Sequence, residues 1–152
     1  EGMLIENSDE PYAYEVAKAV IDSRRREKIE TTTRLREIIE KALQFLPAKE
    51  RKDEIKKCCA RTFQALRIDV NSEFEVLYDF LEKLPDALNP GGRVAILTFH
   101  SGEDRLVKKS FKALKNVGIY SDVSNEVIRP SREECNMNPR AKSTKMRWAV
   151  KL

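Results

Sequence analysis

Apolar residues in the first seventy positions recur at the spacing of α-helices. Over 12–22 they form a single stripe, which consists of Ala13, Val16, Ala17, Val20 and Ile21. The threonines at 31–33 are suitable N-cap residues for a second helix, and the apolar stripe after them consists of Leu35, Ile38, Ile39, Ala42 and Leu43. The polar segment 46–57 is expected to be exposed, with a third helix beginning near Cys58. The pattern predicts a small all-helical unit.

The pattern changes after Asn71. Ser72 and Glu75 have the spacing of a capping box, and apolar residues follow at helical spacing, namely Phe74, Leu77, Leu81 and Leu84. The sequence PDALNPGG ends this helix with prolines and glycines. The apolar run RVAILTF at 93–99 predicts a strand buried on both faces, as in a parallel sheet. A further helix is expected over 103–115.

The C-terminal segment is expected to contain two short strands that are separated by a polar loop. EVIRP at 126–130 predicts the first strand, and the loop 131–145 turns at Asn138-Pro139. The second strand alternates, with a covered face of Met146, Trp148 and Val150 and a wet face of Lys145, Arg147 and Lys151. Trp148 is therefore expected in the core rather than as a stacking platform for a base. Together the elements predict an α/β fold.

Charge changes this picture in the C-terminal part. The chain has 152 residues and a net charge of +4, but 105–115 contains five basic residues and no acidic one. Such a surface favours phosphate-bearing partners, although a solvated lysine-rich face would look the same. Cys58, Cys59 and Cys135 lack the spacing of a zinc site, so no metal is expected, and free thiols indicate a reducing cytosolic setting. No apolar run is long enough to span a bilayer.

Candidate chemistry is concentrated in FHSGEDR, where the predicted strand ends. His100 and Ser101 lie at the strand end, where α/β sheets bind ligands. Glu103 and Asp104 fall in the first turn of the next helix and are interpreted as structural. A serine hydrolase is excluded, because Ser101 lacks the G-x-S-x-G context and the only histidine is its neighbour. The few glycines form no phosphate-cradling loop.

Three segments in register resemble one family. They are ARTFQALRIDVNSEFEVL at 60–77, LNPGGRVAILTFHSGEDRLVKKSF at 88–111 and NPRAKSTKMRWAV at 138–150. Together they resemble the bacterial small-subunit ribosomal RNA cytosine-N4 methyltransferases, over nearly the whole chain. The resemblance implies an S-adenosylmethionine-dependent enzyme with a Rossmann-like fold and a helical insertion. Residues 1–70 would be part of the helical insertion domain, and 71–152 the C-terminal part of the catalytic domain, with 126–130 and 145–150 as its final hairpin.

The sequence also departs from the family pattern. The glycine-rich cofactor loop of the family's N-terminal half does not occur here, so S-adenosylmethionine is expected to bind mainly to that missing half. The chain is therefore expected to be a C-terminal fragment that is inactive alone, with an open sheet edge that a homodimer or another partner covers. Gly102 replaces the family's usual leucine, and Cys58-Cys59 stands where His-Pro is frequent.

The resemblance implies three kinds of site residue. His100, Ser101 and Asn138 are the expected catalytic residues. The expected contacts to RNA are Arg105, Lys108, Lys109, Arg140, Lys142 and Ser143. Gln64, Arg67 and Asn71 are expected to order the domain junction. His100 could instead only close the strand end, and Arg67, Arg140 and Lys142 could be ordinary ion-pair or surface charges.

The implied function is N4-methylation of a cytidine in small-subunit ribosomal RNA by the parent protein. Ribosomal RNA is then the expected partner, with no membrane partner. The expected location is the cytoplasm, or an organelle if the source is eukaryotic. The alternative is a non-catalytic RNA-binding or ribosome-assembly module derived from the same fold, which would keep the basic face and lose the cofactor site.

Overall fold

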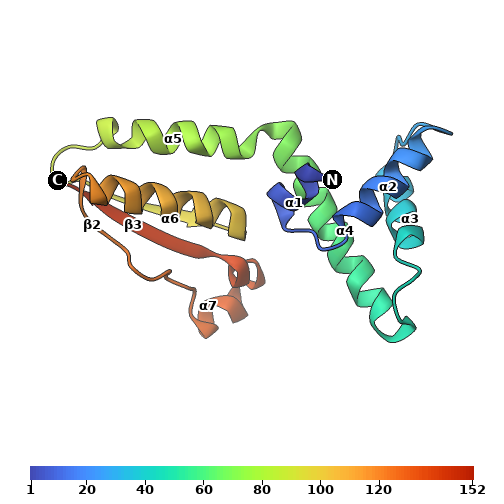
Figure 1. Ribbon diagram of the computed structural model, residues 1–152. Coiled ribbons are helices and arrows are strands. Elements are labelled where there is room, and N and C mark those ends of the chain that lie inside the picture. The colour runs from blue at the N-terminus through green and yellow to red at the C-terminus, as the bar shows by residue number, and fades with distance from the viewer. The chain divides into compact units, whose positions relative to one another are not determined.

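The computed structural model describes all residues, 1–152, and the chain forms two compact units. The first unit is Glu1–Glu73 and the second is Phe74–Leu152. Figure 1 shows helices alone in the first unit, and helices with a small sheet in the second. None of the helices combines the length and the apolar character that crossing a membrane requires.

The first unit contains α1 (Gly2–Ser8), α2 (Ala13–Arg24), α3 (Thr32–Ala42) and α4 (Ala48–Asn71). The helices expected over 12–22 and after the threonines are confirmed, and the Thr31 hydroxyl accepts a hydrogen bond from Arg34 N at 3.1 Å. The predicted stripes supply most of its core, which consists of Leu4, Ala13, Val16, Leu35, Ile39, Leu43, Cys58 and Ala65.

Helix α4 begins ten residues before the predicted start near Cys58. The polar segment is helical because its charges pair along the helix surface, as between Lys57 Nζ and Glu54 Oε1 at 2.8 Å. The helix ends at Ser72, whose φ of 50° lies in the left-handed region. Ser72 therefore terminates α4 rather than forming the predicted capping box with Glu75. Helix α1 was not predicted either.

A buried ion pair joins α4 to the segment between α1 and α2. The Glu10 side chain has no exposed surface, and its two carboxylate oxygens accept hydrogen bonds from Arg61 at 2.7 and 3.2 Å. Glu10 Oε1 also accepts from the backbone N–H of Tyr12 at 3.0 Å. The hydrogen bond to Glu10 is the main reason that the pKa of Arg61 is raised. This network compensates the burial of the charge.

The second unit contains nearly all of α5 (Glu73–Ala87), then β1 (Arg93–Thr98), α6 (Ser101–Asn116), β2 (Tyr120–Val123), α7 (Arg132–Met137), the 3₁₀ helix η1 (Pro139–Ser143) and β3 (Lys145–Lys151). The strand order is β1-β3-β2, and both pairings are antiparallel. The mixed α/β class is confirmed, whereas the expectation of a parallel arrangement around 93–99 is wrong for these strands.

Helices α5 and α6 lie on the same side of this sheet (Figure 1). They share one core with the strands, which consists of Leu81, Leu84, Val107, Phe111, Tyr120, Val123 and Ala149. Only this face of the sheet is covered. On β1, Val94 and Ile96 pack against the core, while Ala95 and Leu97 are exposed. The prediction that 93–99 is buried on both faces is therefore wrong for this chain, and β1 hydrogen-bonds along one edge only, to β3.

The C-terminal hairpin differs from the prediction in its partner strand. The strand beside β3 is Tyr120–Val123, whereas in 126–130 only Ile128 forms an isolated bridge, with Met146. The predicted loop 131–145 contains α7 and η1, because Ser131 and Asn138 cap them with side-chain oxygens. These two short helices were not predicted, because the segment is polar and shows no apolar stripe.

The two faces of β3 are also exchanged relative to the prediction. Arg147 and Ala149 are the buried positions of the strand, while Trp148 is only half-buried. Arg147 can be buried because Asp104 of α6 pairs with it. The expected wet face is therefore the one that packs against α6.

Candidate functional site

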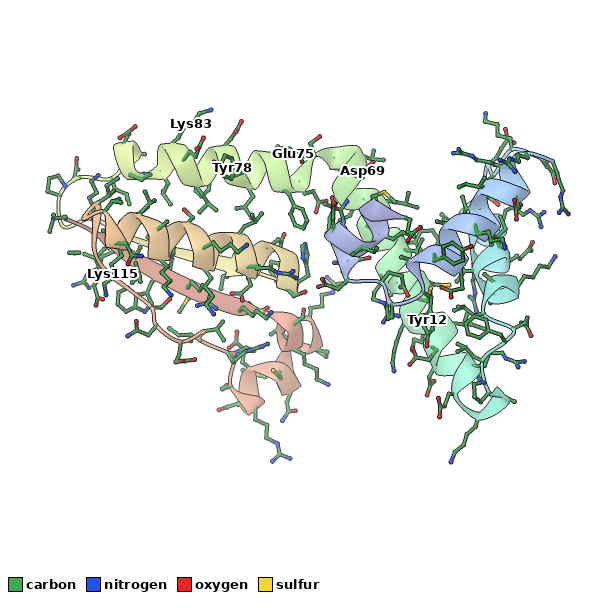
Figure 2. All side chains as sticks on the ribbon, in the orientation of Figure 1. Tyr12, Asp69, Glu75, Tyr78, Lys83 and Lys115 are labelled. Carbon is green, nitrogen blue, oxygen red and sulfur yellow. The ribbon has the colours of Figure 1, made fainter.

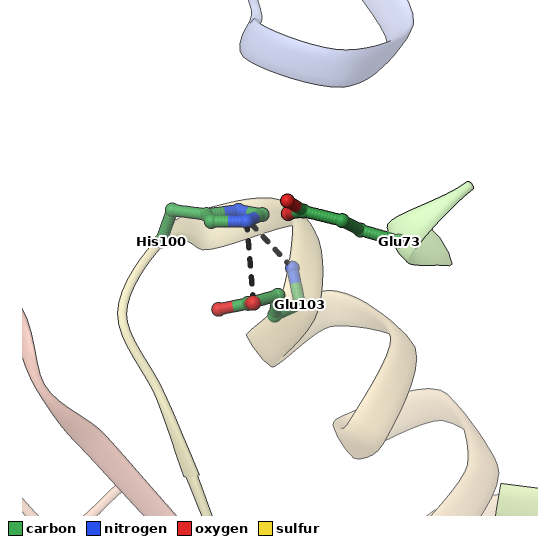
Figure 3. A group of neighbouring side chains, drawn as sticks. All are labelled: Glu73, His100 and Glu103. Atoms are coloured by element: carbon green, nitrogen blue, oxygen red, sulfur yellow. Dashed lines mark hydrogen bonds and ion pairs between the residues drawn. The ribbon is translucent and has the colours of Figure 1, made fainter. Parts of the chain in front are cut away.

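The candidate site lies where β1 ends and α6 begins. Phe99 and His100 link the two elements, and His100 is the N-cap of α6. Its Nδ1 accepts a hydrogen bond from the backbone N–H of Glu103 at 3.4 Å (Figure 3). In return, Glu103 Oε2 accepts from the backbone N–H of Phe99 at 2.9 Å. This reciprocal arrangement resembles a capping box with a histidine cap, and it confirms the structural role that was predicted for Glu103.

The cap fixes the hydrogen-bonding state of His100. Because Nδ1 accepts a hydrogen bond, it carries no proton, and the proton of the neutral ring lies on Nε2. Nε2 lies 3.5 Å from Glu103 Oε1, and the His100 side chain is 11% exposed. The Nε2 atom is itself buried. In this arrangement the imidazole serves as the cap of α6 through Nδ1.

The second acidic residue of the motif, Asp104, belongs to a charge cluster beneath the turn. Its carboxylate accepts hydrogen bonds from Arg147 at 2.7 and 3.3 Å, and Lys145 Nζ lies 3.9 Å away. Burial raises the pKa of Asp104, but Arg147, Lys145 and Lys108 together lower it further, so the pKa lies below its ordinary value. Asp104 fastens α6 to β3, which confirms its predicted structural role.

Phe74 packs over the first turn of α6. Its ring centroid lies 5.8 Å from that of His100. A Cβ on Gly102 would lie 2.5 Å from Phe74 Cζ and 3.2 Å from His100 Nδ1. Glycine at position 102 therefore allows this close packing, and a leucine there would require Phe74 to move. Phe74 was predicted only as a helical core position, so its contact with the strand end was missed.

The predicted substrate residues fall into two groups. Ser101, Arg105, Lys108 and Lys109 lie on α6 and are exposed. The other group lies on or beside η1 and is also exposed, namely Asn138, Arg140, Lys142 and Ser143. The sheet register brings the start of α6 and η1 to one end of the sheet, because Thr98 pairs with Lys145 and Thr98 Oγ1 hydrogen-bonds to Lys145 O at 3.4 Å.

Asn138 has a local structural role in this arrangement. Its Oδ1 accepts a hydrogen bond from Arg140 N at 3.2 Å and so begins η1. No hydrogen bond in the structure joins Asn138 to His100. The two residues are placed at the same end of the sheet by the register, and their joint action on a substrate stays a prediction.

The residues expected to order the junction lie near the end of α4. Arg67 donates to Glu73 at 2.8 and 3.1 Å, and Asn71 Nδ2 donates to the same carboxylate at 3.3 Å. Gln64 is half-buried on the same helix. Arg67 and Asn71 thus stabilise the turn from α4 into α5, whereas a role in ordering two domains stays a prediction.

The chain belongs to the MraW methylase family, whose family model matches residues 1–152. This confirms the family that the three sequence segments indicated.

Curated relatives agree with this assignment. A protein of Lachnoclostridium phytofermentans named ribosomal RNA small subunit methyltransferase H 1 is 68% identical over 152 residues, which are 99% of this chain and 42% of the relative. One of the same name from Agathobacter rectalis is 69% identical, over 99% of this chain and 43% of the relative. Ribosomal RNA small subunit methyltransferase H 2 of Alkaliphilus metalliredigens is 59% identical, over 99% and 44%. The chain therefore spans less than half the length of these relatives.

Proposed function

We propose that the protein carrying this chain methylates the N4 amine of a cytidine in small-subunit ribosomal RNA, with S-adenosylmethionine as methyl donor. The observation that carries the proposal is the match of the whole chain to relatives named ribosomal RNA small subunit methyltransferase H, at 68% and 69% identity. The cytidine and its N4 atom come from the likeness of FHSGEDR and its neighbouring segments to that enzyme family.

The residues of this chain do not fit a cradle for S-adenosylmethionine. The turn from β1 into α6 is closed to a ligand. The backbone N–H of Glu103 already donates to His100 Nδ1, and Phe74 packs against Gly102. The other strand-to-helix connections contain no cluster of glycines. We therefore place the cofactor mainly on parts of the protein outside these 152 residues, and we derive no step of the reaction through it.

Two features of the second unit support a Rossmann-like fold that extends beyond the three strands. One edge of β1 has no partner strand, and the sheet face with Leu97 is uncovered, leaving that side chain 57% exposed. In doubly wound folds helices cover both faces, and parallel neighbours extend the sheet. We propose that further structure of the same protein covers this edge and face; a second copy of the chain is the alternative cover. The helical first unit would be part of an insertion into this fold.

The part of the reaction that this chain performs is the placement of the cytosine. Its amine must present a lone pair in line with the methyl group, and alignment supplies much of the rate. In the proposal, the imidazole of His100 and the amide of Asn138 hydrogen-bond the base, with Ser101 beside them at the start of α6. The exposed charges of Arg105, Lys108, Lys109, Arg140 and Lys142, with the Ser143 hydroxyl, would hold the RNA backbone.

Variants that preserve the caps separate this role from a purely structural one. Asparagine is also a good N-cap residue, so His100→Asn keeps an acceptor for Glu103 N but removes the imidazole. Likewise Asn138→Asp keeps the acceptor for Arg140 N but removes the amide donor. We expect each variant to lower the rate of methyl transfer to ribosomal RNA by about 10²-fold, as for the loss of a positioned hydrogen-bond donor.

The matched control is Asn136→Asp, an exposed position two residues before Asn138. It makes the same chemical change in α7 and should leave the rate unchanged. The assay uses the protein at its full natural length. Unchanged rates in both His100→Asn and Asn138→Asp would show that these side chains only cap α6 and η1, and would remove them from the site.

A second candidate function is a non-catalytic RNA-binding or ribosome-assembly module. The closed turn at Gly102 and the basic residues of α6 favour it, because they give RNA contacts without a cofactor site. Such a module binds RNA and transfers no methyl group, so the methyl-transfer assay separates the two functions. Either function would place the protein where ribosomes are assembled, which in a bacterial cell is the cytoplasm.

A further inference from the structure

A basic cavity lies in the second unit, beside α6 and away from the capped turn. Its volume is about 330 Å³, and it opens between α6 and the residues that follow β2. Four cationic side chains line it, namely Lys108, Lys112, Lys115 and Arg147. No carboxylate is among the lining residues, and the apolar side chains are those of Phe111 and Val123. We call it the lysine cavity.

The helix period places three lysines on this side of α6. Lys108, Lys112 and Lys115 are separated by four and three positions, so their side chains follow one another along one face. Phe111 and Val107 anchor the helix in the core. Figure 2 marks Lys115 on α6 and Lys83 on α5. The charges of the lysine cavity are therefore held on a packed helix.

Only part of the positive charge in the lysine cavity is paired with carboxylates. Arg147 is paired with Asp104, and Lys115 Nζ lies 2.7 Å from Asp122 Oδ1. Lys108 and Lys112 form no ion pair with a carboxylate. Like charges one helical turn apart repel each other. An anion in the lysine cavity would remove this repulsion.

The polar lining also suits a phosphate. Asn116 and Asn125 add amide groups that can donate hydrogen bonds to phosphate oxygens. Lysine is a common phosphate ligand because its ammonium acts as a compact point charge. The cavity is small for a folded partner but suits one or two phosphate groups of a single strand.

We propose that the lysine cavity binds the phosphodiester backbone of single-stranded RNA, as a contact separate from the His100 end of the sheet. The proposal rests on the proposed function, which supplies RNA as the substrate class. It adds Lys112, Lys115 and Asn125 to the RNA contacts that sequence indicated. The RNA strand would then follow α6 along its length from the cytosine site.

The salt dependence of RNA binding tests this contact. The protein at its full natural length is titrated into a fluorescent, unstructured RNA oligonucleotide at several salt concentrations. Each phosphate contact that is lost reduces the slope of log affinity against log salt by about 0.7 for a single strand. We expect a reduction of about 0.7 for Lys112→Gln and about 1.4 for the double variant Lys108→Gln/Lys112→Gln.

Lys83→Gln is the matched control, because Lys83 is an exposed lysine of α5 that does not line the cavity. Its slope should equal that of the wild-type chain. Equal slopes for Lys112→Gln and the wild type would overturn the lysine cavity as an RNA site. Displacement of the fluorescent RNA by polyglutamate as effectively as by unlabelled RNA would also overturn it. Absence of RNA binding by the wild type would overturn it together with the RNA-directed function. If the salt slope depends on these lysines but the protein transfers no methyl group, the enzyme function is contradicted and the RNA site is not.

Discussion

Replacement of Arg147 with methionine is expected to lower the free energy of unfolding of the second unit by about 3–5 kcal/mol at pH 7. The arginine side chain is 7% exposed, and its loss would leave the Asp104 carboxylate, 15% exposed, without its bidentate partner. A buried charge that loses its partner is costly because its desolvation is no longer compensated. Urea unfolding followed by the fluorescence of Trp148, the only tryptophan, measures this effect.

The pKa of Asp104 determines how the stability of the second unit changes with pH. In the wild type the pKa of Asp104 is lowered, so its contribution to stability is present above the ordinary value of 3.8 and is lost as the pH falls through the lower, folded-state pKa. In Arg147→Met the carboxylate keeps its burial without its main partner, so the penalty should shrink as the pH is lowered and Asp104 becomes protonated. The double variant Arg147→Met/Asp104→Leu should recover most of the lost stability.

The control for this experiment is the exposed pair of Lys115 and Asp122. Lys115→Met removes a cation from a solvated pair and should change the unfolding midpoint little. If Arg147→Met and Lys115→Met had equally small effects, the Asp104 pair would not fasten α6 to β3.

A loss of similar size, about 3–5 kcal/mol, is expected in the first unit when Arg61 is replaced with methionine. Glu10 has no exposed side-chain surface, and Arg61 supplies two of the hydrogen bonds to its carboxylate. The backbone N–H of Tyr12 would remain as a donor, but it carries no compensating charge. Urea unfolding followed by far-ultraviolet circular dichroism, which reports the helices, measures the change.

Arg36→Met is the matched control in the same unit. Arg36 pairs with Glu40 at 2.8 Å on the surface of α3, where both side chains are solvated. Its replacement should change the helical transition little. A transition of Arg61→Met that coincided with those of Arg36→Met and the wild type would show that the buried pair contributes nothing to this unit.

The features that sequence predicted correctly are those that depend on neighbours along the chain. Thr31 caps α3 because its hydroxyl needs only the backbone N–H three residues later. Glu103 and Asp104 lie in the first turn of α6 for a similarly local reason. The apolar stripe of α3 is buried because helix period alone brings Leu35 and Ile39 to one face.

The features that sequence missed depend on residues far apart in the chain. Arg147 was placed on a wet face because its partner, Asp104, lies 43 positions away. The strand Tyr120–Val123 was missed because only two of its four residues are buried. Its pairing with β3, rather than its own sequence pattern, makes it a strand. The direction of β1 relative to β3 likewise follows from the register Arg93 to Val150, which no local pattern contains.

The candidate site was predicted in its residues but not in its geometry. The strand end at His100 was recognisable because an apolar run stops at a polar loop and a helix start. That His100 itself caps α6 could not be read from sequence, because histidine is not a usual N-cap residue. The proximity of Phe74 to Gly102 also depends on how α5 packs, which only the structure shows.

Identification of the methylated nucleoside tests the central proposal most directly. The protein at its full natural length is incubated with S-adenosylmethionine that carries an isotopically labelled methyl group and with unmethylated small ribosomal subunits or their RNA. The RNA is then digested to nucleosides for mass spectrometry. We predict that the label appears in N4-methylcytidine, and that His100→Asn strongly reduces it. Label in another nucleoside, or no label under conditions where the protein is folded and binds RNA, would contradict the proposed function.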